Sequence, residues 1–233
     1  MSDPLIDIIK KHSTGMAPES SLRFLFGLMD TIYKTIGEEA IRYGDGVHPK
    51  HRLIAYHEFF ITHIRASDTV LDIGCGDGTV TEAVAGKALG QVTGIDKAIG
   101  VVQNNSKRHN PPNVQYLHGD ATQLDRAKDK HGLGEQDAVI LSNILEHVQF
   151  PDEVLRDVQR LFKPRIALIR LPMFERDWMV PIRRELGVNY MLDDTHIKEY
   201  TERQSIDMVD SGGYEIIEMH TKWSEFWIAA EVK

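Results

Sequence analysis

The feature that most constrains this chain is a glycine-rich turn, VLDIGCGDGTVTEAVA, which runs from Val70 to Ala85. Glycine occupies every second position of the turn, at residues 74, 76 and 78. Because glycine has no Cβ and tolerates positive φ, this density predicts a backbone that turns tightly or that another molecule approaches closely. The apolar residues before the turn and the helical pattern after it predict a strand–turn–helix unit. In a doubly wound sheet, ligands bind beyond the carboxyl ends of the strands, at turns of this kind.

The turn matches neither of two common phosphate-binding motifs. A P-loop needs a lysine and a hydroxyl residue after its last glycine, whereas Thr79 and Val80 follow Gly78. A dinucleotide-binding turn needs its third glycine at the sixth position of the motif, which is Thr79 here. The glycines by themselves are also compatible with a turn that binds nothing. The ligand therefore has to be inferred from the other strands.

From Thr69 onward, the sequence alternates short apolar runs with helical patterns. Such alternation predicts an α/β protein with a doubly wound, mostly parallel sheet and helices on both faces. The predicted strands are residues 70–73, 91–95, 114–118, 137–142, 165–171, 214–220 and 225–232. Helices are predicted to begin near Gly78, Gly100, Leu124, Pro151 and Ile197. The last two strands are joined by residues 221–224, so we predict a seven-stranded sheet with one antiparallel strand at its C-terminal end.

The first 66 residues contain helical patterns and no pattern typical of a strand. Apolar residues recur at three- and four-residue spacing in 22–36, and a second helical pattern covers 53–64. A break with two glycines and a proline, YGDGVHPKH, separates these two patterns. We therefore predict an N-terminal helical cap or lid at 1–66 and a ligand-binding domain at 67–233.

The composition excludes several classes of partner and compartment. The net charge is −8, and no long basic run is present, which argues against a broad nucleic-acid surface. Cys75 is the only cysteine, so no internal disulfide can form, as is usual in a reducing compartment. The first residues lack the pattern of a signal peptide, and no apolar run approaches membrane-spanning length. We expect a cytoplasmic protein without nucleic-acid binding or membrane insertion.

Polar residues stand where each of the next three predicted strands ends. Asp96 ends the second strand, where a carboxylate can accept hydrogen bonds from both hydroxyls of a ribose. Asp120 follows the third strand, where a carboxylate can accept a bond from an adenine amino group. Ser142 and Asn143 end the fourth strand. Either aspartate alone could be a helix cap, but together these residues predict a site for an adenosine with an attached amino acid.

These motifs resemble those of the class I (Rossmann-like) S-adenosylmethionine-dependent methyltransferases of the small-molecule type. VLDIGCGDG is similar to the first motif of that family, GID to the second, GDAT to the third and DAVILSNILEHV to the fourth. The resemblance implies S-adenosylmethionine as cofactor and S-adenosylhomocysteine as product. It implies that Gly74 and Gly76 lie against the methionine part of the cofactor and that Asp72 holds its amino group through neighbours or water. It also implies that Asp96 binds the ribose, and Asp120 with Ala121 the adenine. The full set of cofactor-binding residues expected is Asp72, Gly74, Cys75, Gly76, Gly78, Asp96, Lys97, Asp120, Ala121, Ser142 and Asn143.

Three histidines are candidates for catalysis. His147, in NILEHV, follows the fourth strand, and it is either a general base for a hydroxyl acceptor or a packed loop residue. His51 and His57 lie in the predicted cap and are weaker candidates. NILEHV is also similar to a Glu-x-x-Glu-His motif of metal-dependent members, including ubiquinone-type O-methyltransferases. Asn143 replaces the first glutamate, and hard cations prefer several carboxylates, so no metal is expected.

The resemblance also implies that an insertion at about 172–200 forms the acceptor site. The candidate substrate-binding residues in it are Trp178, Arg183, Arg184, Tyr190 and His196. An arginine pair suits an anionic group, although charged residues on a solvated helix face are the more frequent case. In the final hairpin, Trp223 and Trp227 are predicted to lie in the core, with the wall of the acceptor pocket as the alternative.

The sequence therefore predicts a methyltransferase that acts by direct displacement on a small-molecule or sugar-type acceptor, at a hydroxyl oxygen. One alternative is an N- or C-methyltransferase of a quinone- or lipid-like acceptor. Another is a non-catalytic scaffold that retains the cofactor fold. The oligomeric state is left open.

Overall fold

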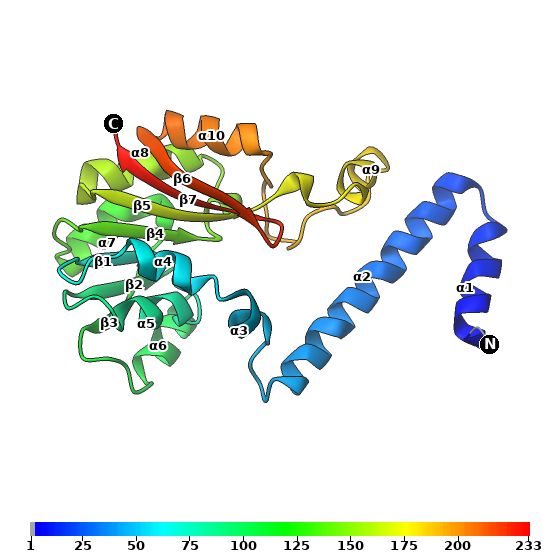
Figure 1. Cartoon of the computed structure of the whole chain (residues 1–233), viewed down its shortest axis with the longest axis horizontal. Helices are drawn as coiled ribbons and strands as arrows, with labels where there is room; N and C mark the ends of the chain where they lie inside the picture. Colours follow the sequence, from blue (N-terminus) through cyan, green and yellow to red (C-terminus); the bar gives the residue numbers. More distant parts are fainter. Residues whose placement is uncertain (1–2) are drawn as a thin grey trace. The chain divides into compact units, whose positions relative to one another are not determined.

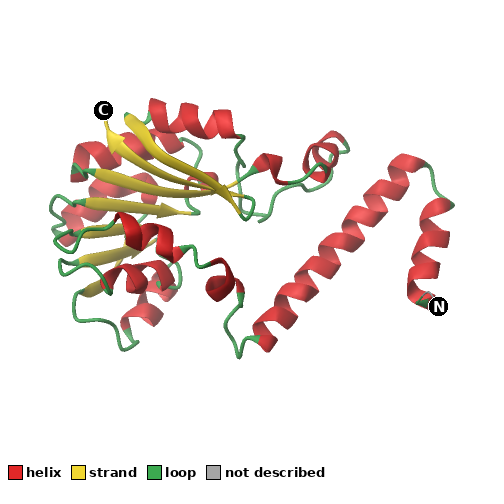
Figure 2. Cartoon of the chain, viewed as in Figure 1, coloured by secondary structure: helices red, strands yellow, loops and turns green. Residues whose placement is uncertain are grey.

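The computed structural model describes residues 3–233, which contain a seven-stranded sheet (Figures 1 and 2). The strands are β1 (Val70–Ile73), β2 (Val92–Asp96), β3 (Val114–His118), β4 (Ala138–Ser142), β5 (Ile166–Pro172), β6 (Tyr214–Lys222) and β7 (Glu225–Val232). Their order in the sheet is β3-β2-β1-β4-β5-β7-β6. β7 pairs antiparallel with both β5 and β6, whereas β1 to β5 pair in parallel. The predicted fold class, with one reversed strand near the C-terminus, is confirmed.

The strand order reverses direction between β1 and β4. The chain runs outward from β1 to β2 and β3, and then returns to place β4 on the other side of β1. The loops that follow β1 and β4 therefore leave the sheet in opposite directions and open a crevice at its carboxyl edge. Both strands are almost wholly apolar and buried, as a central parallel strand must be when both faces are covered. Of the polar residues predicted from the sequence, Asp72 and Ser142 line the pocket at this crevice.

Helices cover both faces of the sheet (Figure 2). Those in the chain are α1 (Pro4–Thr14), α2 (Pro18–Tyr43), α3 (Lys50–Ile54), α4 (His57–His63), α5 (Thr79–Ala85), α6 (Ile99–Ser106), α7 (Leu124–His131), α8 (Pro151–Phe162), α9 (Met179–Glu185) and α10 (Glu202–Ser211), with short 3-10 turns η1 (Ala121–Gln123), η2 (Leu145–His147) and η3 (Phe174–Arg176). One buried apolar cluster joins helices to strands of the sheet, and it includes Leu124 of α7, Phe162 of α8 and Val209 of α10. None of the helices of residues 3–233 is long and apolar enough to cross a membrane.

The C-terminal hairpin has a tighter turn than its sequence indicates. β6 extends two residues further than predicted, to Lys222, whereas β7 has the predicted bounds, so only Trp223 and Ser224 connect them. Both residues have positive φ, 54° and 63°, as a two-residue hairpin turn that follows the strand twist requires. The prediction that Trp223 lies in the core is wrong, because its place at the tip leaves it 62% exposed. Trp227, within β7, is buried as predicted.

Two predicted helices have different bounds in the structure. The pattern at 53–64 forms two short helices, α3 and α4, because Ala55 between them has left-handed φ and ψ. The last helix begins at Glu202 rather than near Ile197. Thr201 is its N-cap and forms a reciprocal capping box with Gln204, which fixes the start of the helix.

The chain divides into two compact units. The larger contains the sheet and comprises residues 56–176 and 192–233; the smaller comprises the residues up to 55 together with 177–191. Within the smaller unit, Arg183 of α9 donates through Nη1 to both carboxylate oxygens of Asp30, at 2.9 and 3.2 Å. Its guanidinium also lies 4.5 Å from the centre of the Phe26 ring. The predicted cap at 1–66 and insertion at 172–200 each include residues of both units, and their functions stay predictions.

Candidate functional site

The three glycines of the turn after β1 all have positive φ, between 52° and 80°. At Gly74, a Cβ would lie well inside contact distance of the Ile144 side chain, so the turn packs directly against the segment after β4. At Gly76, by contrast, a Cβ would meet nothing within 4 Å. Packing therefore requires the glycine at 74, whereas the open space beside Gly76 can admit another molecule.

Asp72, on β1, is a buried acid beneath this turn. Its side chain accepts a hydrogen bond of 2.6 Å from the Thr81 hydroxyl of α5, and the residue is 1% exposed. Burial raises the pKa of the Asp72 carboxyl to about 7, and the Thr81 bond offsets part of that effect. The carboxylate is therefore costly to keep charged without a partner, and a cation placed beside it would be held strongly.

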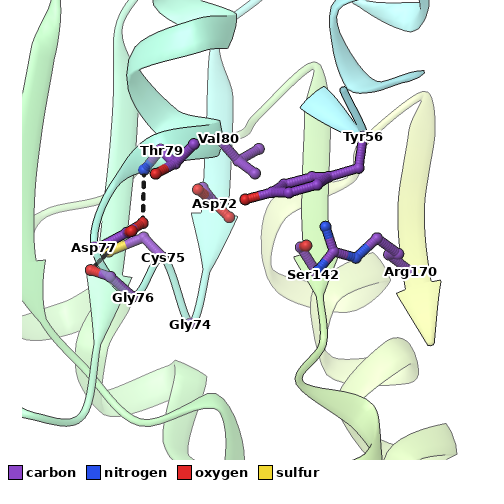
Figure 3. Close-up of a pocket in the computed structure, with 10 residues that line it drawn as sticks. All are labelled: Tyr56, Asp72, Gly74, Cys75, Gly76, Asp77, Thr79, Val80, Ser142 and Arg170. Carbon is purple, nitrogen blue, oxygen red and sulfur yellow. Dashed lines mark hydrogen bonds between the residues drawn. The ribbon is translucent and has the colours of Figure 1, made fainter. Parts of the chain in front are cut away.

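A pocket of about 140 Å³ opens between the glycine turn and the ends of β4 and β5 (Figure 3). Its lining residues are Tyr56, Asp72, Gly74, Cys75, Gly76, Asp77, Thr79, Val80, Ser142 and Arg170. Five of these were predicted from the sequence as cofactor-binding residues. Tyr56, Asp77, Thr79, Val80 and Arg170 were not. Arg170 had a signal in the sequence, since it is the one charged residue inside the apolar run IALIRLP.

Arg170 brings a positive charge to the pocket wall beside Ser142 (Figure 3). Its Nε donates to Asn143 Oδ1 at 3.1 Å and lies 3.3 Å from a Glu225 carboxylate oxygen. The guanidinium carbon is 3.9 Å from the centre of the Tyr56 ring, a cation–π contact. Nη1 is buried and has no hydrogen-bond partner among the described residues. The pocket thus contains a guanidinium that can bind one further acceptor.

Asp96 and Asp120 lie at the ends of their strands, as predicted. Asp96 accepts the Gly76 amide at 3.1 Å and the Ala98 amide at 2.8 Å, one on each oxygen, so each oxygen retains accepting capacity. Asp120 caps η1, and both of its bonds, from the Thr122 amide and hydroxyl, go to Oδ1. The Asp120 carboxylate is therefore a cap of η1, and the Asp96 carboxylate connects the glycine turn to the residues after β2; both can also accept hydrogen bonds from a ligand.

The remaining predicted cofactor residues have varied surroundings. Cys75 is buried against Val102 and Tyr116, and burial raises the pKa of its thiol, which makes it a packing residue. Lys97 is exposed, and its carbonyl accepts from His118 at 3.1 Å. Asn143 has a φ of 56°, and its amide donates to the Arg170 carbonyl. Gly78 lies so close to Tyr116 that an added Cβ would be 2.3 Å from the tyrosine hydroxyl oxygen. Ala121 is half-buried at the start of η1.

A second group of polar side chains, the 146–196 cluster, consists of Glu146, His147 and His196. One potential ligand atom from each of the three lies within 4.8 Å of the other two. Glu146 is fully buried, and neither of its carboxylate oxygens has a partner among the described residues. The centroids of the His147 and His196 rings are 4.7 Å apart. Burial lowers the pKa of His147, so its ring is neutral near pH 7.

The other predicted site residues are divided between the two units. His57 begins α4 in the larger unit, next to Tyr56, and its Nδ1 is buried without a partner among the described residues. His196 is also in the larger unit. In the smaller unit are His51, Trp178, Arg183, Arg184 and Tyr190. Trp178 is 71% exposed, whereas the buried Arg183 is occupied by its contacts to α2. The roles of all these residues stay predictions.

Comparison with known proteins identifies relatives for most of the chain. The profile of a methyltransferase domain family matches residues 47–219. The ubiquinone biosynthesis O-methyltransferase of Albidiferax ferrireducens is 34% identical over 121 residues, which are 50% of this chain and 46% of that protein. The chain spans about half the length of the curated relatives it matches.

Solved methyltransferase structures share the fold at low sequence identity. Magnesium protoporphyrin IX methyltransferase from Synechocystis PCC 6803, solved with bound S-adenosylhomocysteine, has a TM-score of 0.59 and 16% identity. The comparison covers 84% of this chain and 86% of that one. A small RNA methyltransferase has a TM-score of 0.62 and 17% identity, over 77% of this chain and 25% of the other. At these identities, the structures establish the fold alone.

Proposed function

Because the chain belongs to the class I S-adenosylmethionine-dependent methyltransferases, we propose that it transfers a methyl group from this cofactor to a hydroxyl oxygen of a quinone-type acceptor. The observation that carries the proposal is the pocket beside the glycine turn, with a buried acid and a buried guanidinium in its wall.

The pocket has the charges that a free amino-acid group needs. The methionine end of the cofactor is a zwitterion, with an ammonium and a carboxylate on the same carbon. Asp72 suits the ammonium, because that ion removes the penalty of a buried, unpaired carboxylate. Arg170 suits the carboxylate, because no group of residues 3–233 hydrogen-bonds to its Nη1 and its contacts to Tyr56 and Asn143 fix its position. The open side of Gly76 leaves space for the chain that joins this end to the nucleoside.

The reaction is a direct displacement at the methyl carbon. The acceptor oxygen forms a bond to the methyl group while the carbon–sulfur bond breaks, and the sulfonium becomes the neutral thioether of S-adenosylhomocysteine. The protein contributes alignment of the two reactants and exclusion of water. A hydroxyl acceptor must also lose its proton, and the neutral imidazole of His147, beyond the end of β4, is the predicted proton acceptor.

The acceptor class is inferred from the relatives rather than from the pocket. These two curated relatives are O-methyltransferases of ubiquinone biosynthesis. They support methylation at an oxygen, as the sequence predicts, and they support a quinone-like acceptor, which the sequence analysis gave as an alternative. These two relatives do not support the sugar-type acceptor. Exclusion of nucleic acid stays a prediction from the net charge of −8, since one structural neighbour methylates small RNA. Location in the cytoplasm likewise stays a prediction.

Calorimetric titration tests the proposal first at the level of the cofactor. We expect saturable, micromolar binding of S-adenosylmethionine and S-adenosylhomocysteine, and no binding of NADH. Turnover with catechol-type phenols of increasing apolar tail length then tests the acceptor class. If neither adenosyl compound binds to protein shown by mass spectrometry to carry no cofactor, the function proposed here is rejected in favour of a scaffold.

Substitution Asp96→Ala tests the ribose site. The change removes an acceptor for the ribose hydroxyls and releases the Gly76 amide, so affinity for S-adenosylhomocysteine should fall about 10- to 100-fold, or about 1–3 kcal/mol. Calorimetry measures the loss, with Asp125→Ala as a control on the exposed first turn of α7. Equal affinities of the two variants would remove Asp96 from the site.

Cofactor binding should depend on pH through Asp72. Below its raised pKa of about 7 the carboxyl is protonated and cannot pair with the ammonium, so affinity should rise up to about tenfold between pH 6 and pH 8. Without ligand, the native state keeps on Asp72 a proton that the unfolded chain releases between about pH 4 and pH 7. The free energy of unfolding should therefore fall as the pH rises through that window.

Asp72→Asn is the matched variant for this pH dependence, since it keeps the shape of the side chain and removes the titration. Calorimetry at four pH values should give a flat profile for Asp72→Asn, with weaker binding at pH 8 than the unsubstituted protein has. The same slope in both proteins would assign the pH dependence to another group.

A further inference from the structure

Asn105 is a buried polar residue beside the glycine turn. It lies on α6 with an exposed fraction of 4%, although asparagine is usually found at the surface, where water satisfies its amide. Val102, one helical turn earlier, packs with Cys75 of the glycine turn and with Tyr116 of β3. Residues three apart lie on the same face of a helix, so Asn105 faces the glycine turn as well. Its side-chain amide must therefore find its hydrogen-bond partner there.

Three side chains hold the backbone of the turn at residues 76 and 77. Asn105 Nδ2 donates to the Gly76 carbonyl oxygen at 2.7 Å. The Gly76 amide donates to Asp96 Oδ2 at 3.1 Å. The next carbonyl oxygen, that of Asp77, accepts from Arg108 Nη2 at 2.6 Å. Asp96 ends β2, whereas Asn105 and Arg108 lie at the end of α6 and just after it, so the turn is fixed by residues outside it.

Glycine at position 76 leaves the orientation of the next peptide to its surroundings. Gly76 has a φ of 52°, and a Cβ there would meet nothing within 4 Å, so neither a side chain nor close packing restricts rotation of the peptide that joins it to Asp77. A trans peptide is planar, with its C=O and N–H on opposite sides. Because Asn105 holds the Gly76 carbonyl toward α6, the Asp77 N–H points away from α6. Both residues of this peptide line the pocket (Figure 3), so its rotation decides which of the two polar groups faces the pocket.

We infer that Asn105 is a positioning residue of the pocket, because its side-chain amide keeps the Gly76–Asp77 peptide in a single orientation. It lies outside the pocket lining and acts through the peptide that it holds. An N–H group attracts an anionic group in the pocket, whereas a carbonyl oxygen in its place repels it. The consequence for cofactor affinity rests on the proposed function, since the cofactor brings a carboxylate to this pocket. The role of Asn105 in fixing the turn does not rest on it.

Arg108 supports the same turn but should contribute less. Its side chain is 45% exposed, and the nitrogen that reaches the Asp77 carbonyl also pairs with Glu82 at 2.5 Å. Exposed charged contacts contribute little, because water competes for both partners. Asn105, in contrast, is buried, and its removal takes from the Gly76 carbonyl the side-chain donor that fixes it. The larger effect is therefore expected at Asn105.

Substitutions at Asn105 test the inference by calorimetry with S-adenosylhomocysteine. Without the amide the peptide can rotate, and if it then adopts the binding orientation about a tenth of the time, the affinity falls about tenfold. Asn105→Ala and Asn105→Asp should both show this loss, because neither donates to the Gly76 carbonyl, whereas Arg108→Ala should lose about threefold or less. Asn105→Asp keeps the size of the side chain and Asn105→Ala avoids a buried charge, so a result from either stands if the other does not fold.

Asn113→Ala is the matched control for a merely structural role. Asn113 Nδ2 also donates to backbone, to the carbonyl oxygens of Ala88 at 2.8 Å and of Gly90 at 3.1 Å. It directly precedes β3, so it lies at the amino end of the sheet, away from the pocket. The midpoint of thermal unfolding should fall in Asn113→Ala as in Asn105→Ala, but Asn113→Ala should keep the affinity of the unsubstituted protein for S-adenosylhomocysteine. A loss of affinity in both variants, in step with stability, would make Asn105 a structural residue.

Hydrogen–deuterium exchange of the ligand-free proteins separates this inference from the proposed function. Asn105→Ala should raise the exchange of residues 70–85 relative to the unsubstituted protein, and Asn113→Ala should not. Unchanged exchange in that segment overturns the inference, as does unchanged affinity when the unsubstituted protein binds S-adenosylhomocysteine. A larger loss of affinity in Arg108→Ala than in Asn105→Ala assigns the positioning role to Arg108 instead. Raised exchange in Asn105→Ala, with no binding of S-adenosylhomocysteine by the unsubstituted protein, rejects the proposed function alone.

Discussion

Replacement of Arg170 by methionine should weaken S-adenosylhomocysteine binding about 10- to 100-fold and leave binding of 5′-methylthioadenosine almost unchanged. The second compound has the same adenosine and sulfur but lacks the amino acid, so it makes no use of a guanidinium that binds the carboxylate. A hydrogen bond to a charged group contributes about 1.5–3 kcal/mol, which corresponds to the loss expected. Calorimetry measures, for each compound, the ratio of its affinity for the unsubstituted protein to its affinity for Arg170→Met.

Two further variants make the result specific. Arg170→Lys keeps the charge but not the fork of donors, so it should recover part of the affinity for S-adenosylhomocysteine. Asp96→Ala, in contrast, should weaken both compounds, because both contain the ribose. Arg170→Met also removes the contacts to Asn143, Glu225 and Tyr56, so its unfolding transition is measured alongside. A similar loss for both compounds would mean that Arg170 supports the pocket without binding the carboxylate.

The fold could be predicted from the sequence because its signals are local and repeated. Most of the parallel strands are short, largely apolar runs, and helical patterns with apolar residues at helical spacing separate them. The bounds of β1 and β3 were predicted to the residue. Two of the errors lie where one residue adopts a left-handed conformation that its type does not favour. Ala55 divides a helix in this way, and Trp223 turns a hairpin and so leaves the core.

The site was predicted where its residues follow the ends of successive strands, and was missed where distant segments meet. Asp72, Gly74 and Ser142 line the pocket because the sheet order places β1 beside β4. Tyr56 precedes the first strand by more than a dozen residues, and no periodic pattern relates it to the pocket. His196 reaches Glu146 because backbone hydrogen bonds fold its segment onto η2. Contacts of this kind depend on loop conformation, which a single sequence specifies weakly.

Alanine at Gly74 should lower the free energy of unfolding by about 2–5 kcal/mol. The new Cβ would overlap the Ile144 side chain, and overpacking of this kind costs about 1–3 kcal/mol. The residue must also keep a φ of 72°, which costs a non-glycine residue roughly 1–2 kcal/mol more. For a chain of this size, that loss lowers Tm by roughly 5–15 °C. Thermal and urea unfolding measure the change.

Gly76→Ala is the matched control, because it has a positive φ of 52° but open space where the Cβ would lie. Its free energy of unfolding should fall by roughly 1–2 kcal/mol, the cost of positive φ for a non-glycine residue. Its affinity for S-adenosylhomocysteine should fall about tenfold or more, because the added methyl group fills space in the pocket. Ile144→Ala, added to Gly74→Ala, should recover part of the stability, and the double-mutant cycle isolates the overlap. If Gly74→Ala is as stable as Gly76→Ala, close packing between the two loops does not explain the glycine at 74, and its positive φ alone accounts for it.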